Sequence, residues 1–174
     1  RMKSTASIHT HPIHPMLIPF PFAFLTGAWG FRVAAAFSEN DDLKTVSRYL
    51  VPAGLVAGLV AAVPGLVDYL GSVPPQSSAK ERATKHALFN VGSLALFTLS
   101  WLADRRRRRA LPLALETAGT ATLCVAGWMG GTLAYRNQIG VDHRYANAGK
   151  WQEERGEVDD AAALDSAAHG LGVN

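Results

Sequence analysis

Four long apolar blocks constrain this chain more than any other feature of its sequence. They cover residues 16–37, 49–70, 86–103 and 111–135. Each is long enough to cross a hydrocarbon core as a helix, which takes about 20 residues. A soluble four-helix bundle would keep a polar face on every helix, whereas these blocks are apolar on all sides. The pattern therefore predicts an all-α, polytopic membrane protein built as a four-transmembrane-helix antiparallel bundle.

The apolar blocks divide the chain into three parts. A polar, His-containing leader covers residues 1–12, a transmembrane domain covers 13–136, and an extramembrane C-terminal tail covers 137–174. We expect the leader to be solvated and partly disordered. No internal repeat is convincing, although the first and third predicted helices both begin with a histidine. The predicted helices span about residues 14–37, 49–71, 83–103 and 110–135.

Five consecutive arginines, residues 105–109, follow the third block. Basic residues are densest in the loops after the first and third blocks, so the positive-inside rule places this turn in the cytoplasm and both chain ends outside a bacterial inner membrane. A basic run is also typical of nucleic-acid binding. At the end of an apolar block a membrane anchor is the better interpretation, and we expect the lipid bilayer, not nucleic acid, as the partner.

Polar residues gather on the opposite, outer side. In an antiparallel bundle the starts of helices one and three share that side with the ends of helices two and four. Ionisable groups within membrane segments are costly and are candidates for function. Near the arginine run, Glu116 is expected to pair with one of those arginines. The outer residues are His14, Asp68, His86, Asn90, Tyr135, Arg136, Asp142 and His143.

One interpretation of the outer residues is a haem b site. Two imidazoles from facing helices are the usual way a membrane bundle holds haem, and His14 and His86 lie at the same predicted depth. They would be the ligands of the haem iron. Asn90 and Arg136 would complete the cofactor site, Arg136 through a haem propionate, while Asp68, Asp142 and His143 would orient the ligands.

A second interpretation needs no cofactor. His14 then supports a proline-kinked helix start, and His86 bonds Asp68 or a backbone carbonyl in a structural network. A third interpretation is that His9, His11 and His14 gather a copper or zinc ion within the leader. His169 in the tail is expected to be incidental.

Several classes of function find no support in the sequence. The single cysteine, Cys124, excludes disulfides and Cys-based metal sites within the chain. There is no Cys-x-x-Cys-His, Gly-x-Ser-x-Gly, phosphate loop or His-Glu-x-x-His. No hydrolase or transferase is predicted, and any redox role is that of an electron-transfer subunit.

Five short motifs carry a resemblance to a known family. They are HPMLIPFP at residues 14–21, PGLVDYL at 64–70, the Ala83-x-x-His86-x-x-x-Asn90 face, GWMGGTLAY at 127–135 and IGVD at 139–142. With these motifs the chain resembles a bacterial family of four-helix membrane proteins, domain of unknown function 2231 (DUF2231). The resemblance implies the fold and the compartment. Some members resemble partners of redox proteins such as Rieske-type domains, which favours a redox role for His14, Asp68, His86, Asn90 and Asp142.

Two functions from different classes remain. The first is an integral membrane, redox-associated subunit that binds haem b between helices one and three for electron transfer within a larger membrane or periplasmic redox complex. The second is a cofactor-free accessory subunit. Its Gly-rich helix faces and acidic tail would dock and stabilise a larger membrane protein complex.

Overall fold

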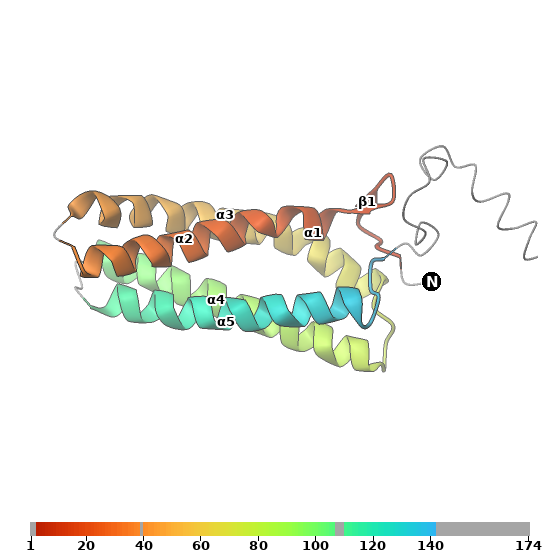
Figure 1. The fold of residues 1–174 in the computed structure, drawn as a ribbon. Coiled ribbons are helices and arrows are strands. Elements are labelled where there is room, and N and C mark those ends of the chain that lie inside the picture. Colours follow the sequence, from red (N-terminus) through yellow and green to blue (C-terminus); the bar gives the residue numbers. More distant parts are fainter. Residues whose placement is uncertain (1–2, 39, 107–109, 142–174) are drawn as a thin grey trace, which may run out of the picture. The chain divides into compact units, whose positions relative to one another are not determined.

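The computed structural model describes residues 3–38, 40–106 and 110–141. This part of the chain is helical apart from one short hairpin of two strands, which pair antiparallel. Four long helices lie side by side (Figure 1). In chain order the elements are β1 (Ser7–Ile8), β2 (His11–Pro12), α1 (Ile13–Leu17), α2 (Pro19–Ala36), α3 (Asp41–Gly71), α4 (Ser78–Arg105) and α5 (Leu111–Tyr135).

Local sequence sets the ends of these helices. Prolines open α2 and α5, where the missing amide has no helical partner to lose. Asn40 caps α3 by accepting a 2.9 Å hydrogen bond from the amide of Asp42, and Ser77 caps α4 by accepting a 3.1 Å bond from the amide of Lys80. These caps begin α3 and α4 earlier than their apolar blocks, so both helices extend beyond the ranges predicted from hydropathy.

The helices confirm an all-helical membrane-type architecture. Among the described residues, three segments are long and apolar enough to cross a membrane: Ile13–Ala36, Asp41–Gly71 and Ser78–Arg105. The fourth predicted span, α5, forms a 25-residue helix, but it contains Glu116 and several threonines and lies outside this group. Large apolar side chains of α3, such as Val56, Leu59 and Leu70, face outward, as expected for contact with lipid.

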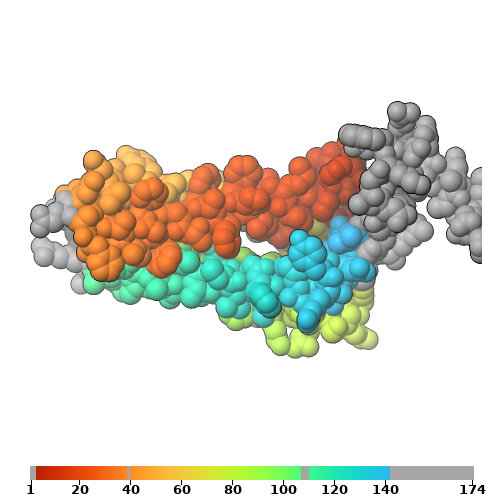
Figure 2. Space-filling view, in the orientation of Figure 1, coloured from red at the N-terminus to blue at the C-terminus, as the bar shows by residue number. Residues whose placement is uncertain are grey.

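The helices pack as two close pairs. α2 packs mainly on α3, and α4 packs mainly on α5, while the pairs meet more sparsely along α3 with α4 and along α2 with α5. Figure 2 shows the surface of α1 and α2 lying along that of α5. The core between the pairs is built around Leu25, Val51, Phe97 and Leu123.

The two helix pairs repeat one pattern of buried positions, although the sequence alone shows no convincing repeat. Inward-facing residues of α1 and α2 recur in α4 at a constant interval of 72 residues. These pairs are His14 and His86, Pro21 and Ser93, Leu25 and Phe97, Ala28 and Ser100, and Arg32 and Asp104. Inward-facing residues of α3 recur in α5 at a different constant interval, 65 residues: Val51 and Glu116, Gly54 and Gly119, Ala61 and Ala126, and Gly65 and Gly130.

Equivalent glycines make equivalent contacts in the two pairs. A Cβ on Gly54 would lie 2.5 Å from Leu25 Cδ2, and a Cβ on Gly119 would lie 2.9 Å from Phe97 Cδ2. Each glycine thus admits the large apolar side chain of the neighbouring helix, as small residues do where helices approach closely. The predicted use of these glycine-rich faces for docking a partner is weakened, because the faces are filled within the chain.

The leader forms a short hairpin, and its first residues contact the end of α3. Its two strands form a hairpin whose turn residues, His9 and Thr10, have positive φ angles of 47° and 69°. Ser4 is buried, with an exposed fraction of 9%. The contacts with the end of α3 come from residues 4–6, while residues 7–11 are exposed, so the expectation of a solvated leader stands for that part. The predicted tail lies outside the described residues from position 142 onward.

Candidate functional site: a histidine pair and a buried charge cluster

His14 and His86, which occupy equivalent positions in the two helix pairs, lie next to each other. Their ring centroids are 6.4 Å apart, and the ring planes meet at 85°. His14 belongs to the short helix α1, and His86 lies two turns into α4. The structure therefore brings together the two residues that the sequence proposed as ligands.

Both imidazoles are held by the same kind of hydrogen bond. His14 Nδ1 lies 2.8 Å from the carbonyl oxygen of Ala61, and His86 Nδ1 lies 2.8 Å from that of Ala126. A carbonyl oxygen can only accept, so each Nδ1 carries the donated proton. In the neutral imidazole, Nε2 is then the unprotonated nitrogen of both rings, which is the state of a metal-ligating histidine.

A glycine makes room for each imidazole. A Cβ on Gly65 would lie 2.8 Å from His14 Nδ1, and a Cβ on Gly130 would lie 3.1 Å from His86 Cε1. Each glycine stands four residues after the alanine whose carbonyl accepts the histidine bond, one helical turn away on the same face. The two Ala-x-x-x-Gly segments thus accommodate the two rings in the same way: the alanine carbonyl accepts a hydrogen bond, and the glycine leaves room for the ring.

Asn90 supports His86 from one turn further along α4. Its Nδ2 donates to the carbonyl oxygen of His86 over 2.9 Å and lies 3.2 Å from His86 Nε2. Because His86 Nδ1 already donates to Ala126, Nε2 is the ring nitrogen able to accept from Asn90. Asn90 therefore helps to fix the orientation of the His86 imidazole.

Asp68 has a different role from the one predicted. Its carboxylate accepts hydrogen bonds from Ser4 Oγ at 2.8 Å, from the amide of Ala6 at 3.0 Å and from Ser72 Oγ at 3.0 Å. It bonds neither His14 nor His86. The expectation that Asp68 orients a histidine was wrong, because the leader folds over the end of α3 and supplies the donors instead.

The other predicted site residues that the structure describes, Arg136 and His11 among them, are exposed. Arg136 is exposed at the end of α5. Asp142, His143 and His169 lie outside the described residues. His11 Nδ1 donates to the carbonyl oxygen of His9 over 2.8 Å within the hairpin, and both residues are exposed. Within residues 3–38, 40–106 and 110–141, no three His, Cys, Asp or Glu side chains are grouped to hold a metal ion.

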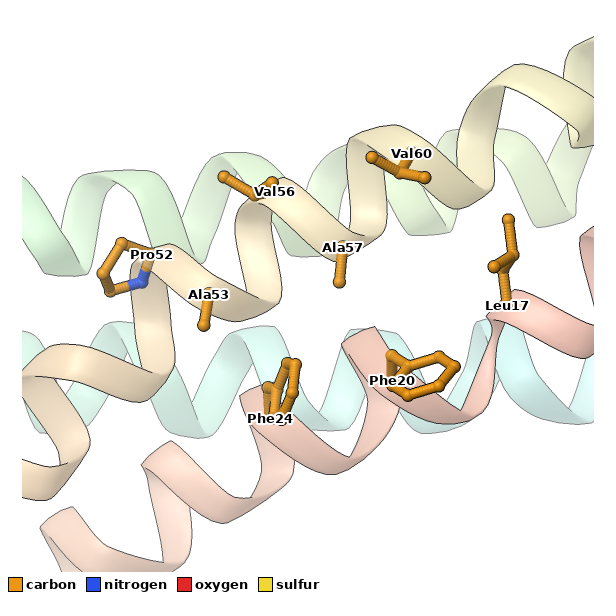
Figure 3. Close-up of a pocket in the computed structure, with 8 residues that line it drawn as sticks. All are labelled: Leu17, Phe20, Phe24, Pro52, Ala53, Val56, Ala57 and Val60. Atoms are coloured by element: carbon orange, nitrogen blue, oxygen red, sulfur yellow. The ribbon is translucent and has the colours of Figure 1, made fainter.

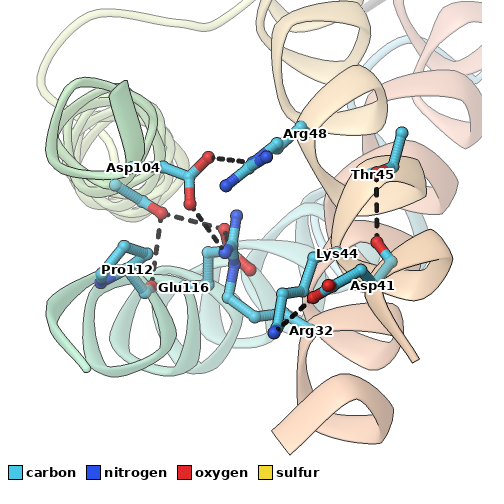
Figure 4. Close-up of polar contacts among 9 residues, drawn as sticks. Arg32, Asp41, Lys44, Thr45, Arg48, Asp104, Pro112 and Glu116 are labelled. Atoms are coloured by element: carbon cyan, nitrogen blue, oxygen red, sulfur yellow. Dashed lines mark hydrogen bonds and ion pairs between the residues drawn. The ribbon is translucent and has the colours of Figure 1, made fainter. Parts of the chain in front are cut away.

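A buried cluster of charges lies at the other end of the helices (Figure 4). Glu116 is fully buried, and its Oε1 accepts from Arg32 Nε at 2.7 Å and from Ser100 Oγ at 2.8 Å. Arg32 Nη1 also donates to Asp104 Oδ1 over 3.1 Å. Asp104 Oδ2 accepts from Arg48 Nε at 2.7 Å. Four charged side chains from four helices therefore neutralise one another.

Among the described residues the partner of Glu116 is Arg32 of α2, which the sequence did not suggest. Of the arginine run, Arg105 lies over the ring of Trp101 at 4.2 Å. Residues 107–109 of that run lie outside the described residues. Arg32 and Asp104 are equivalent positions of the repeat, and this spacing was the signal in the sequence that could have identified the pair.

A groove on the outer surface runs between the two helices of the first pair (Figure 3). It has a volume of about 550 Å³. Leu17, Phe20 and Phe24 line one side, and residues of α3 from Pro52 to Val60 line the other. All of these side chains are apolar, so in a membrane the groove suits lipid acyl chains rather than a polar substrate.

Comparisons with known proteins identify one family. The family model described as "Predicted membrane protein (DUF2231)" matches residues 10–143. This match covers every described helix, both histidines and the whole charge cluster. No curated protein and no solved structure matches the chain.

Proposed function

The chain belongs to the DUF2231 family of predicted membrane proteins, and on that basis we propose that it is an electron-transfer subunit holding haem b between His14 and His86. One observation carries the proposal. Two imidazoles from separate helix pairs meet at 6.4 Å, and both use Nδ1 for a backbone hydrogen bond. Both therefore keep Nε2 unprotonated, and a metal on His86 would replace the hydrogen bond that Asn90 donates to this nitrogen.

The distance between the rings fits one metal ion. Two metal–nitrogen bonds of about 2 Å each account for about 4 Å of the separation between ring centroids. The remainder is close to the two ring radii. The Ala-x-x-x-Gly segments orient each imidazole before a metal binds, which lowers the free-energy cost of binding. Bound haem b supplies one-electron redox chemistry, and the chain supplies the ligands and their orientation.

The sparse packing between the helix pairs also supports a flat cofactor there. The pairs pack tightly within themselves and meet along fewer positions with each other. A planar group between them separates α1 from α4 without opening either pair. Gly131 adds open space next to Gly130, the glycine that makes room for His86, because a Cβ on Gly131 would meet nothing within 4 Å. Arg136, which is exposed at the end of α5, would pair with a propionate at the outer edge.

In this proposal four helices cross a bacterial inner membrane as an antiparallel bundle. α5 joins the three more apolar spans, and its Glu116 is neutralised by Arg32 within the bundle. The arginine turn lies in the cytoplasm, and the histidine pair lies near the outer surface. Electrons would pass to or from a periplasmic or membrane redox partner at that surface.

A cofactor-free accessory subunit is the second candidate. The observation in its favour is that each histidine already has a hydrogen-bond partner within the chain, and His86 has Asn90 as well. Such a pair can serve packing alone. Exposed Trp128 and Tyr135 at the end of α5 would then be the surface for a partner complex, because the inner glycines are filled.

A reduced-minus-oxidised absorption spectrum of the native protein, purified in detergent, tests the proposal. We expect a sharp α-band with one haem b per chain. His14→Ala and His86→Ala should each remove it, while His11→Ala, which changes an exposed histidine, should leave it intact. A blank spectrum from protein purified without loss of cofactor favours the accessory subunit. Retained haem in both His14→Ala and His86→Ala contradicts the ligand assignment.

A further inference from the structure

Glu116 is the most deeply buried charged side chain among the described residues. It lies in α5 at the end of the bundle away from the histidines, and the equivalent position in α3 is the apolar Val51. An ionisable group in a membrane segment is costly and marks a functional site by default. Glu116 has no part in the proposed haem site, so the cost of burying its charge must be explained by another role.

The two oxygens of this carboxylate have unequal surroundings. Oε1 accepts from Arg32 Nε and Ser100 Oγ. Oε2 is buried and has no hydrogen-bond partner within the described part of the chain. Thr120, one helical turn further along α5, also has a buried hydroxyl without a described partner. A proton on Oε2 would therefore break no existing bond, because Oε1 would still accept both donors as a carbonyl oxygen.

The neighbouring charges tolerate the neutral form of Glu116. Arg32 donates to Glu116 through Nε and to Asp104 through Nη1, so it keeps a carboxylate partner when Glu116 is protonated. Asp104 in turn keeps Arg48. The charged groups that face this site are thus Arg32 from α2, Arg48 from α3 and Asp104 from α4. Protonation of Glu116 leaves one extra positive charge shared between two arginines.

The cluster leads from the buried carboxylate to the surface. The side chain of Arg32 is 10% exposed, that of Asp104 is 14% exposed and that of Arg48 is 54% exposed. Each contacts the next through a hydrogen bond, drawn as a dashed line in Figure 4. Water therefore reaches Asp104 beside Arg48, at the same end as the arginine turn. The histidine end offers Glu116 no such polar connection among the described residues.

We propose that Glu116 is a proton-binding site inside the bundle, which takes a proton onto Oε2 from water at the arginine-turn end and releases it to that side. The step is a simple proton transfer: hydronium gives a proton to the carboxylate, forming a carboxylic acid and water. No electron moves and no bond to carbon changes. This proposal does not depend on haem.

Infrared difference spectroscopy of the full chain tests the proposal. We expect a carbonyl band of a buried carboxylic acid that appears on lowering the pH and shifts in D₂O. Glu116→Gln should remove this band, while Glu81→Gln, which changes an exposed carboxylate at the start of α4, should keep it. A pH difference spectrum with no band that depends on Glu116 overturns the proposal. So does a band that persists unchanged at every pH, since it denotes a permanently neutral acid.

Ser100→Ala provides a second route if Glu116→Gln does not fold. Ser100 Oγ donates to Glu116 Oε1 over 2.8 Å, so alanine removes one of the two hydrogen bonds to the carbonyl oxygen of the acid. We expect the band to move in frequency and its midpoint pH to change. A band and midpoint identical to those of the wild type contradict this assignment of the proton. Because both variants can be measured without haem, failure here leaves the histidine proposal standing, and the reverse also holds.

Discussion

The two ends of the bundle use one scaffold in opposite ways. At the histidine end, equivalent positions of the repeat carry the same residue, so His14 faces His86 across the axis between the helix pairs. At the charged end, equivalent positions carry opposite charges, so Arg32 faces Asp104. A symmetric pair suits a ligand that needs the same group on both sides. A pair of opposite charges suits neutralisation within the membrane. Among the described residues, Glu116 is then the buried carboxylate whose second oxygen has no hydrogen-bond partner.

The largest expected effect comes from breaking the charged end. Arg32→Met leaves Glu116 and Asp104 without their shared partner in the interior, and losing one member of a buried pair costs about 3–5 kcal/mol. Unfolding in a denaturing detergent titration measures the change. Arg48→Met, at a side chain that is 54% exposed, should cost no more than about 1 kcal/mol. Equal losses in the two variants would show that burial does not distinguish the two arginines.

The repeat itself predicts a second effect. Gly54→Ala and Gly119→Ala each place a methyl group within 3 Å of a large side chain, and such overpacking costs about 1–3 kcal/mol. The same titration should show losses of similar size for both. Gly30→Ala is the matched control, because a Cβ there meets nothing within 4 Å, and alanine favours a helix interior by up to about 1 kcal/mol. Opposite signs at Gly54 and Gly119 would break the equivalence of the two pairs.

Asp68 separates the leader from the histidine site. Asp68→Asn weakens the hydrogen bonds from Ser4, Ala6 and Ser72, and we expect a loss of about 1–3 kcal/mol. Hydrogen exchange over residues 3–12 should accelerate while the visible spectrum stays unchanged. Asp41→Asn, at a side chain that is 87% exposed, serves as the control. Loss of haem in Asp68→Asn would restore its predicted role as a histidine partner.

The smallest perturbation tests which end faces outside. In a Cys124→Ala background, Val141→Cys and Ser38→Cys place single thiols at opposite ends of the helices, at exposed positions. A membrane-impermeant thiol reagent added to spheroplasts should label the first and spare the second. Neither change should alter stability, since both side chains point away from the core. The reverse labelling would put the arginine turn outside.

Hydropathy was sufficient to predict the helical architecture, because apolar blocks of this length have few other uses. It placed the helix starts too late at Asp41 and Ser78, where polar caps rather than apolar residues begin the helix. The positions of His14 and His86 along their predicted helices also placed the two residues at the same depth in the membrane. Their contact depends on Gly65 and Gly130, and one sequence without an alignment gives no measure of such packing.

The partners of Asp68 and Glu116 could not be predicted for a related reason. Asp68 accepts hydrogen bonds from leader residues more than 60 positions away. The leader has no apolar pattern from which its fold could be predicted. Glu116 pairs with Arg32 across 84 positions. Proximity to the arginine run was a poor guide, since a buried carboxylate needs a partner at its own depth. The repeat, read at its interval of 72 residues, would have paired Arg32 with Asp104.

Electron paramagnetic resonance of the oxidised, detergent-purified native protein tests the histidine pair most directly. Two imidazole ligands from equivalent positions predict a low-spin ferric haem. Ring planes near the observed 85° predict the strongly anisotropic signal of perpendicular imidazoles. His14→Ala and His86→Ala should lose it alike, since the repeat makes the two ligands equivalent. A high-spin signal from the native protein, or a low-spin signal that survives either substitution, would contradict haem coordination by this pair.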